Sequence, residues 1–410
     1  MLIVYINVLL WLFSLSFFVI RYQRNAQAFF LNYFFYILFF SLFYISLPIC
    51  VSLISGTSAV FASEQTISAT ANIGTYFVFV FLLSYILSVD KSFKLDRITR
   101  IRIRWIIFLT KIIVTSIALY VCFILMVHLT DILAIYGRRG QQSTFSFYLE
   151  TTYKIKPLFI VSILLISHLF LSQQKGNYLL LLLPFIGYDL IFSGRTYLFG
   201  IFILFFILKV IQGRLFKLIY VFIGIFLIAA ISAIRNPGQG GFELVGLILI
   251  FYEFINTFST AHLMYESPLA QDFLYSVNYS FFRILPSPFY PIFFGDYVSY
   301  TQITGDANPL GWGLAGSLVA EAISFKNLFI TMIFPFFIVI YGVFMNYFFR
   351  SKTYSGVILF IISLIFLQQI IRYSFFELAS YPFYMLLFFG FHIILIDLYS
   401  LKRNEGHRKC

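Results

Sequence analysis

Long apolar stretches repeat along almost the whole chain, and they limit its possible folds more than any other feature. Eleven runs of close to twenty residues are predicted to be spans, at 1–20, 28–54, 71–89, 105–127, 157–174, 178–193, 197–211, 218–234, 327–349, 355–371 and 378–396. A helix of this length crosses the hydrocarbon core of a bilayer, whereas β-barrels show shorter, alternating segments. The pattern predicts an all-α polytopic membrane protein with about eleven transmembrane helices, within a range of ten to thirteen.

Composition excludes a soluble fold. Of the 410 residues, 61% are hydrophobic and only 11% are charged, against roughly 25% charged residues in a soluble domain. The net charge of +12 would suggest a nucleic-acid partner in a soluble protein, but in a membrane protein topology accounts for it first. We therefore expect no nucleic-acid partner. The three cysteines form no disulfide framework, and no Cys/His cluster predicts a zinc site. We expect no metal and no cofactor.

Basic residues gather in alternate loops, those that follow the odd-numbered spans. These loops hold 18 of the 28 Lys and Arg residues. Loops rich in Lys and Arg stay in the cytoplasm, so the N-terminus is expected outside and the tail at 397–410 inside. The basic run at 91–104 could bind anionic headgroups, although a topological anchor is the simpler interpretation.

The opposite face carries one large loop, at 235–313, which holds six of the eleven prolines. Residues 244–265 inside it are apolar but interrupted by Glu253, Asn256 and His262. Counting them as a full crossing would place the basic tail outside, so we expect a surface or re-entrant helix there. Residues 314–324 are expected to form a half-helix of the same kind. The whole chain, 1–410, is interpreted as a single integral membrane domain.

Arginines recur on this outer face, where topology disfavours basic residues. They are Arg138 with Arg139, Arg195, Arg235, Arg283 and Arg372, and several stand at the end of a span. A guanidinium presents a planar fork of donors that suits phosphate oxygens. Interfacial snorkelling or an ion pair is the simpler explanation for any single arginine. Their recurrence favours a group that holds a lipid-linked pyrophosphate and stabilises it as a leaving group.

Glu321 and His262 are the candidate acid–base residues, and Trp312 is a candidate sugar-binding residue. Glu321 lies in an apolar half-helix, where a buried carboxylate requires an arginine partner or a catalytic role. His262 and Glu266 are four residues apart and could form an acid–base pair, two metal ligands or, most simply, a structural hydrogen bond. Trp312 lies between two glycines that would let a substrate approach the backbone.

Several short motifs resemble the Wzy-type polymerases, which join lipid-linked oligosaccharide repeat units in O-antigen, enterobacterial common antigen and capsule assembly. The resemblance lies in SGRT at 193–196, ILPSP at 284–288, GWG at 311–313 with GSLVAE at 316–321, and RYS at 372–374. Arg235 and Gly246 also fit the family's spacing of an arginine and a glycine separated by ten residues.

This resemblance implies a polysaccharide polymerase, a glycosyltransferase at the periplasmic face of a bacterial inner membrane, with the N-terminus periplasmic. A hydroxyl of an incoming lipid-linked unit attacks the anomeric carbon of a glycan carried on undecaprenyl pyrophosphate, which leaves. Without metal, pyrophosphate or glycan would be bound by a set of six residues: Arg139, Arg195, Arg235, Arg283, Trp312 and Arg372. Glu321, or else His262, would orient or deprotonate the acceptor hydroxyl. A chain-length regulator and a flippase are the implied partners, besides the bilayer.

Two other functions stay open. An O-antigen ligase of the lipopolysaccharide pathway would move the glycan to lipid A core instead of to a second lipid-linked unit. A flippase or exporter of the same lipids would favour charges that line a central cavity and a repeat between two halves. The outer arginines and the single large outer loop favour chemistry at the surface.

Overall fold

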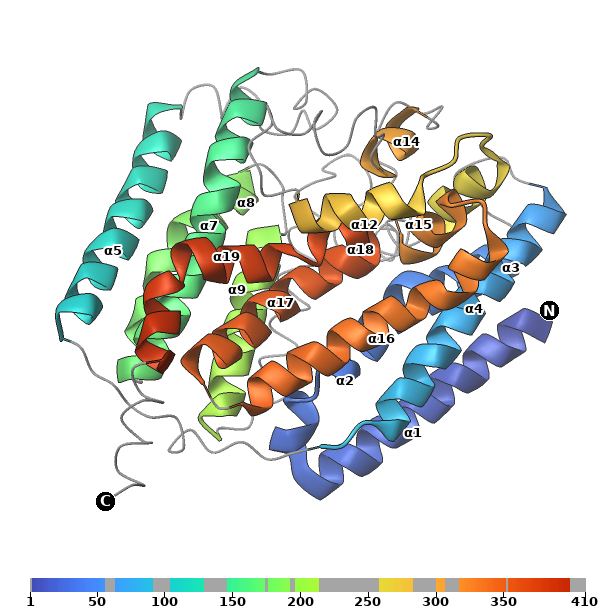
Figure 1. Ribbon diagram of the computed structural model, residues 1–410, viewed down its shortest axis with the longest axis horizontal. Coiled ribbons are helices and arrows are strands. Elements are labelled where there is room, and N and C mark those ends of the chain that lie inside the picture. Colours follow the sequence, from blue (N-terminus) through green and yellow to red (C-terminus); the bar gives the residue numbers. More distant parts are fainter. Residues whose placement is uncertain are drawn as a thin grey trace. The chain divides into compact units, whose positions relative to one another are not determined.

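A computed structural model describes residues 2–55, 63–90, 104–128, 146–173, 176–191, 196–213, 258–282, 300–306, 317–351 and 353–398. Every regular element within these ranges is helical (Figure 1). Seven of the described helices are long and apolar enough to cross a membrane: Leu2–Phe30, Tyr33–Ile54, Glu64–Leu87, Arg104–Val127, Ile155–Gln173, Leu328–Arg350 and Tyr354–Arg372. This is the pattern of an all-α polytopic membrane protein, as the sequence predicts.

Three other predicted spans take different forms. The run at 178–193 begins as a 3-10 helix, η4 (Gly176–Leu182), and continues as α8 (Leu183–Ile191). Pro184 lacks an amide hydrogen, which suits it to the first turn of a new helix. The run at 197–211 forms α9 (Thr196–Ile211), of 16 residues. The last run is a helix pair, Phe375–Phe389 and Phe391–Leu398, bent by 73°. The predicted span at 218–234 lies outside the described residues.

The chain divides into two compact units. Unit 1 takes Met1–Ser92, Phe251–Tyr347 and Phe366–Tyr384, and unit 2 takes Phe93–Ile250, Phe348–Ile365 and Met385–Cys410. The helices of unit 1 are α1 (Leu2–Phe30), α2 (Tyr33–Ser41), the π-helix η1 (Leu42–Ser46), α3 (Leu47–Ser55), α4 (Glu64–Leu87), 258–266, α12 (Phe273–Phe282), α14 (Tyr300–Asp306), α15 (Leu318–Ser324), most of α16 (Leu328–Arg350), the end of α17 (Tyr354–Arg372), α18 (Phe375–Leu378) and the start of α19 (Tyr381–Phe389). Those of unit 2 are α5 (Arg104–Val127), α7 (Ser146–Gln173), η4, α8, α9, the start of α17, the end of α19 and Phe391–Leu398.

In unit 1, α1 and α4 run parallel, with the α2–α3 span antiparallel to them. Near the start of α1, the Asn7 side-chain amide donates a hydrogen bond to the Thr75 hydroxyl at 2.7 Å. Further along α1, the Arg21 guanidinium forms an ion pair with Asp90 at 3.1 Å, just beyond the end of α4. From α2–α3, the Ser46 hydroxyl donates to the Asn7 side-chain oxygen at 2.7 Å. Polar side chains buried in apolar helices pair with each other because lipid offers them no partner.

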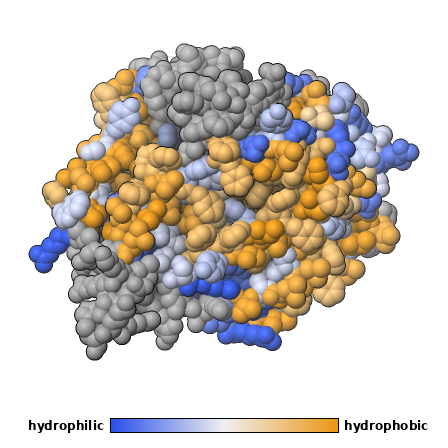
Figure 2. Space-filling model, viewed as in Figure 1, coloured by the Kyte–Doolittle hydropathy of each residue, from blue (hydrophilic) through white to orange (hydrophobic). Residues whose placement is uncertain are grey.

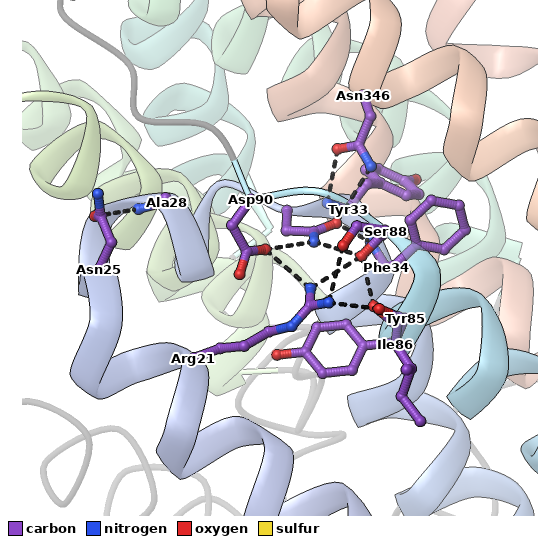
Figure 3. Close-up of polar contacts among 11 residues, drawn as sticks. Arg21, Asn25, Ala28, Tyr33, Phe34, Tyr85, Ile86, Ser88, Asp90 and Asn346 are labelled. Atoms are coloured by element: carbon purple, nitrogen blue, oxygen red, sulfur yellow. Dashed lines mark hydrogen bonds and ion pairs between the residues drawn. The ribbon is translucent and has the colours of Figure 1, made fainter.

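The C-terminal ends of α1, α4 and α16 meet in one polar network (Figure 3). The Arg21 guanidinium also donates to two carbonyl oxygens at the end of α4, each at 2.8 Å, and lies 4.4 Å from the centre of the Tyr85 ring. The Asn32 amide donates to Asp90 at 2.7 Å, and the Asn346 amide donates to the Asn32 oxygen at 3.2 Å. The three helices therefore share one direction.

This shared direction bears on residues 244–265. Because α4 and α16 end on the same side, an odd number of crossings must connect them. The five spans predicted between them satisfy this condition, and a sixth crossing at 244–265 would break it. Residues 244–257 lie outside the described residues, so the interpretation of 244–265 as a surface or re-entrant segment stays a prediction. In the described part of the large loop, the chain forms the short helices 258–266, α12 and α14.

Apolar side chains cover the outside of α16. Phe329 is 71% exposed and Phe344 is 53% exposed. Figure 2 shows hydrophobic side chains spread over the face on which this helix lies in Figure 1. A helix with such a surface is suited to contact with lipid tails.

Unit 2 anchors the starts of two helices with carboxylates from elsewhere in the chain. Asp189 of α8 accepts hydrogen bonds from the Tyr197 and Leu198 amides at the start of α9, at 2.7 and 2.8 Å. Asp397 accepts from the Tyr354 and Ser355 amides at the start of α17, at 2.9 and 2.8 Å. Each carboxylate satisfies donors that the first turn of a helix leaves without partners.

Candidate active site

The RYS motif forms the turn between α17 and α18. Arg372 is the last residue of α17, and Ser374 caps α18 with an extended backbone. The Ser374 hydroxyl accepts a hydrogen bond from the Glu377 amide at 3.1 Å. A serine followed three residues later by a glutamate is the sequence pattern of a helix N-cap. This part of the motif is therefore a structural signal that was readable in the sequence.

Glu321 holds this turn from a distance of 53 residues along the chain. It lies in α15, whose seven residues are all buried, and it is itself fully buried. Its carboxylate accepts hydrogen bonds from the Ser374 hydroxyl at 2.5 Å, the Phe375 amide at 2.6 Å and the Phe376 amide at 3.3 Å. The sequence predicts either an arginine partner or a catalytic role for this carboxylate. Within the described residues, its hydrogen bonds go instead to the start of α18.

The protonation of Glu321 follows from its surroundings. Burial raises the pKa of its carboxyl to about 8, while the hydrogen bonds from Ser374 and Phe375 act in the opposite direction. Both oxygens are engaged and no face of the carboxyl is open to solvent. This geometry favours a role in holding the turn. Deprotonation of an acceptor hydroxyl by Glu321 stays a prediction from the sequence.

Both ends of α15 are tied to the surrounding helices. At its start, the Ser317 amide donates to the Tyr300 hydroxyl of α14 at 3.2 Å. At its end, the Ser324 hydroxyl donates to the Gln271 side chain at 2.9 Å, and the Gln271 amide donates back to the Ser324 carbonyl oxygen at 2.8 Å. Glu321 is thus carried by a short helix that is fixed at both ends. Nothing in the local sequence of α15 announces these partners.

Arg372 stands at the end of a membrane-spanning helix, half-buried, with its guanidinium 5.1 Å from the centre of the Tyr373 ring. One turn earlier on α17, the Gln368 amide donates to the Tyr44 hydroxyl at 2.6 Å. Tyr44 belongs to the π-helix η1. Polar side chains therefore follow the last turns of α17 up to the predicted anion-binding arginine.

His262 and Glu266 share the helix at 258–266 but have different surroundings. The Glu266 carboxylate is exposed and accepts hydrogen bonds from the Ser63 amide at 3.1 Å and the Thr66 hydroxyl at 2.8 Å, which lowers its pKa. His262 is fully buried, with its ring 4.5 Å from that of Phe258. Burial lowers the pKa of His262 to about 4. Of the alternatives for this pair, the structure thus assigns Glu266 to the start of α4.

The remaining predicted site residues lie outside the described residues: Arg139, Arg195, Arg235, Arg283 and Trp312. Within the described ranges, no group of three or more His, Cys, Asp or Glu side chains lies close enough to hold a metal ion. The structure brings Glu321 into contact with the turn after Arg372, although the two motifs lie about fifty residues apart in the chain.

No family model, curated protein or solved structure matches the chain.

Proposed function

We propose that this protein polymerises polysaccharide from lipid-linked oligosaccharide repeat units, as the Wzy-type polymerases that its motifs resemble do. The observation that supports the proposal most is the position of Arg372. Its guanidinium stands at the end of an apolar spanning helix, on a turn that buried Glu321 holds. A substrate with a polyprenyl tail and a pyrophosphate group would keep its tail in the bilayer and present its charge at the membrane face, where such a helix ends.

The proposed reaction exchanges one bond at the anomeric carbon. A hydroxyl oxygen of the incoming lipid-linked unit forms a bond to the reducing-end anomeric carbon of the growing glycan. The bond from that carbon to undecaprenyl pyrophosphate breaks, and the hydroxyl proton ends on the departing pyrophosphate or on water. The arginines stabilise the charge that develops on the leaving group. We assign this binding to Arg372 together with Arg195, Arg235 and Arg283, and binding of the glycan to Arg139 and Trp312.

Glu321 takes a positioning role in this proposal. Its carboxyl fixes the start of α18, and through the turn it fixes the backbone that carries Arg372. Since the reaction runs at the periplasmic face of a bacterial inner membrane, the network around Arg21 would lie at the cytoplasmic side. The basic residues of the alternate loops support this orientation.

The test incubates the purified full-length chain with its cognate undecaprenyl-pyrophosphate-linked repeat units and separates the products by size. Wild type is expected to give a ladder of polymer. Arg372→Ala should slow ladder formation by about a hundredfold or more, the usual effect of removing a group that stabilises transition-state charge. Arg350→Ala is the matched control, since Arg350 also ends a spanning helix, α16, but on the predicted cytoplasmic side, and it should leave the ladder unchanged.

Three outcomes would overturn parts of the proposal. Absence of a ladder with cognate units rejects the polymerase, and transfer to lipid A core in the same assay would identify a ligase instead. An unchanged ladder with Arg372→Ala would reject the assigned role of that arginine. Loss of wild-type activity in EDTA would contradict a reaction that needs no metal.

A further inference from the structure

Two histidines that the proposed reaction does not use lie next to each other inside unit 2. His168 belongs to the last turns of α7, and His392 is the second residue of the helix Phe391–Leu398. Their ring centres are 5.5 Å apart and the ring planes are perpendicular. The Tyr354 ring, at the start of α17, lies 6.3 Å from that of His168.

Hydrogen bonding within the described residues does not account for this pair. His168 is 2% exposed, and neither of its ring nitrogens has a hydrogen-bond partner in the part of the chain that the structure describes. The Nε2 atom of His392 is buried and has none there either. A neutral imidazole brings one donor and one acceptor, and buried polar groups are nearly always paired. Three ring nitrogens thus lack partners at one place.

The carboxylate on the same helix as His392 is already engaged. Asp397, five residues after His392 on the same helix, accepts from the Tyr354 amide, the Ser355 amide and the Ser355 hydroxyl, the last at 2.6 Å. It therefore anchors the start of α17 and does not serve the imidazoles. A ligand from outside the chain would satisfy the nitrogens.

We propose that His168 and His392 together bind a transition-metal ion. Imidazole nitrogen binds such an ion at about 2.0–2.1 Å, which puts two ring centres about 5.2–5.6 Å apart at bond angles between tetrahedral and trigonal. The observed 5.5 Å falls in this range. Imidazole suits zinc, copper and nickel, whereas magnesium and calcium prefer oxygen. Water or the Tyr354 phenol would complete the coordination. The site is independent of the proposed polymerase reaction.

The experiment uses the full-length chain, purified without a polyhistidine tag, and measures bound metal after equilibration with Zn²⁺ and, separately, with Co²⁺. Wild type is expected to hold one ion per chain, and bound Co²⁺ should show the visible absorption of a low-coordinate site with nitrogen ligands. His168→Phe and His392→Phe keep a ring of similar shape but remove the nitrogens. Each should weaken binding by about tenfold or more.

His128→Phe is the matched control, because His128 also lies in unit 2, at the end of α5, and it should bind as wild type does. The histidine of the tail, His407, is present in all variants and sets a common background. If wild type retains no more metal than the double variant His168→Phe/His392→Phe, the proposal fails. It also fails if wild type alone binds no Zn²⁺ or Co²⁺, whether or not the variants fold.

Discussion

Replacing Glu321 by alanine would remove the acceptor that three donors at the start of α18 share. The Phe375 amide, at 2.6 Å, has no room to turn away, because it is part of the first turn of α18. The Ser374 hydroxyl can rotate, but it is buried with the carboxylate. Each buried donor left without a partner costs about 1–3 kcal/mol. With one or two donors stranded, the expected loss of folding stability is about 1–6 kcal/mol.

Thermal unfolding of the purified protein, held in one detergent, measures this loss. The melting temperature should fall by several degrees for Glu321→Ala and by less for Glu321→Gln, whose amide oxygen keeps one acceptor. Glu266→Ala is the matched control, because that carboxylate also binds a backbone amide and a hydroxyl but is exposed. Water can replace it there, so its effect should be small.

Two results would contradict this expectation: a wild-type melting temperature for Glu321→Ala, or an equal fall in melting temperature for Glu266→Ala. Either result would mean that burial of the carboxyl does not decide its contribution. If Glu321→Gln is more stable than Glu321→Ala, as expected, its polymer formation can also be measured. A loss of polymer by this variant shows how strongly the function of the turn at Arg372 depends on Glu321.

Three further results follow from the structure. Because burial raises the pKa of Glu321 from 4.5 to about 8, the folded chain keeps a proton that the unfolded chain loses between these values. Stability should therefore fall as the pH rises from about 4.5 to about 8, by at most about 1.4 kcal/mol per pH unit, and melting curves of Glu321→Gln should show a flatter profile. Arg21→Lys keeps the charge but cannot reproduce the fork that reaches two carbonyl oxygens at the end of α4; we expect a loss of about 1–3 kcal/mol, and wild-type melting would contradict it. Gly356→Ala would press a new Cβ against the Phe348 carbonyl oxygen, whereas at Gly187 the nearest atom to such a Cβ is 3.8 Å away. Gly356→Ala should therefore express poorly or show a lower melting temperature than Gly187→Ala. Equal melting temperatures of the two variants would contradict this.

The spanning helices could be predicted from sequence because bilayer thickness sets their length directly. The breaks were harder. The run at 178–193 contains Pro184, which marks a helix start, and Gly390 stands at the bend of the last predicted span. Both residues sit in stretches so apolar that a count of hydrophobic residues passes over them. Their effect is on the backbone, which a hydropathy pattern does not describe.

At the candidate site, the cap of α18 was visible in the sequence and the partner of Glu321 was not. Ser374 and Glu377 show the spacing of a helix N-cap. Glu321 was expected to need a partner because its neighbours in the sequence are apolar, and the structure supplies that partner from the start of α18. An arginine was the natural expectation, since charge pairs with charge. Every residue except proline has a backbone amide, so the sequence does not show which amides donate to a given carboxylate. Only the three-dimensional structure identifies them.

Carboxylates bind the start of another helix in four places, and this pattern indicates different roles for the acidic residues and the arginines. Glu321, Glu266, Asp189 and Asp397 each accept hydrogen bonds from a backbone amide at the start of a helix, or in its N-terminal cap, to which they do not belong. The start of a helix offers amides and a partial positive charge, so a carboxylate is stabilised there even in apolar surroundings. A chain with only 16 acidic residues thus commits several of them to joining its helices. Carboxylates used in this way do not gather into metal sites or acid–base pairs. An anionic substrate would then be met by arginines such as Arg372, which supports the proposed division between acids that hold helices and arginines that bind pyrophosphate.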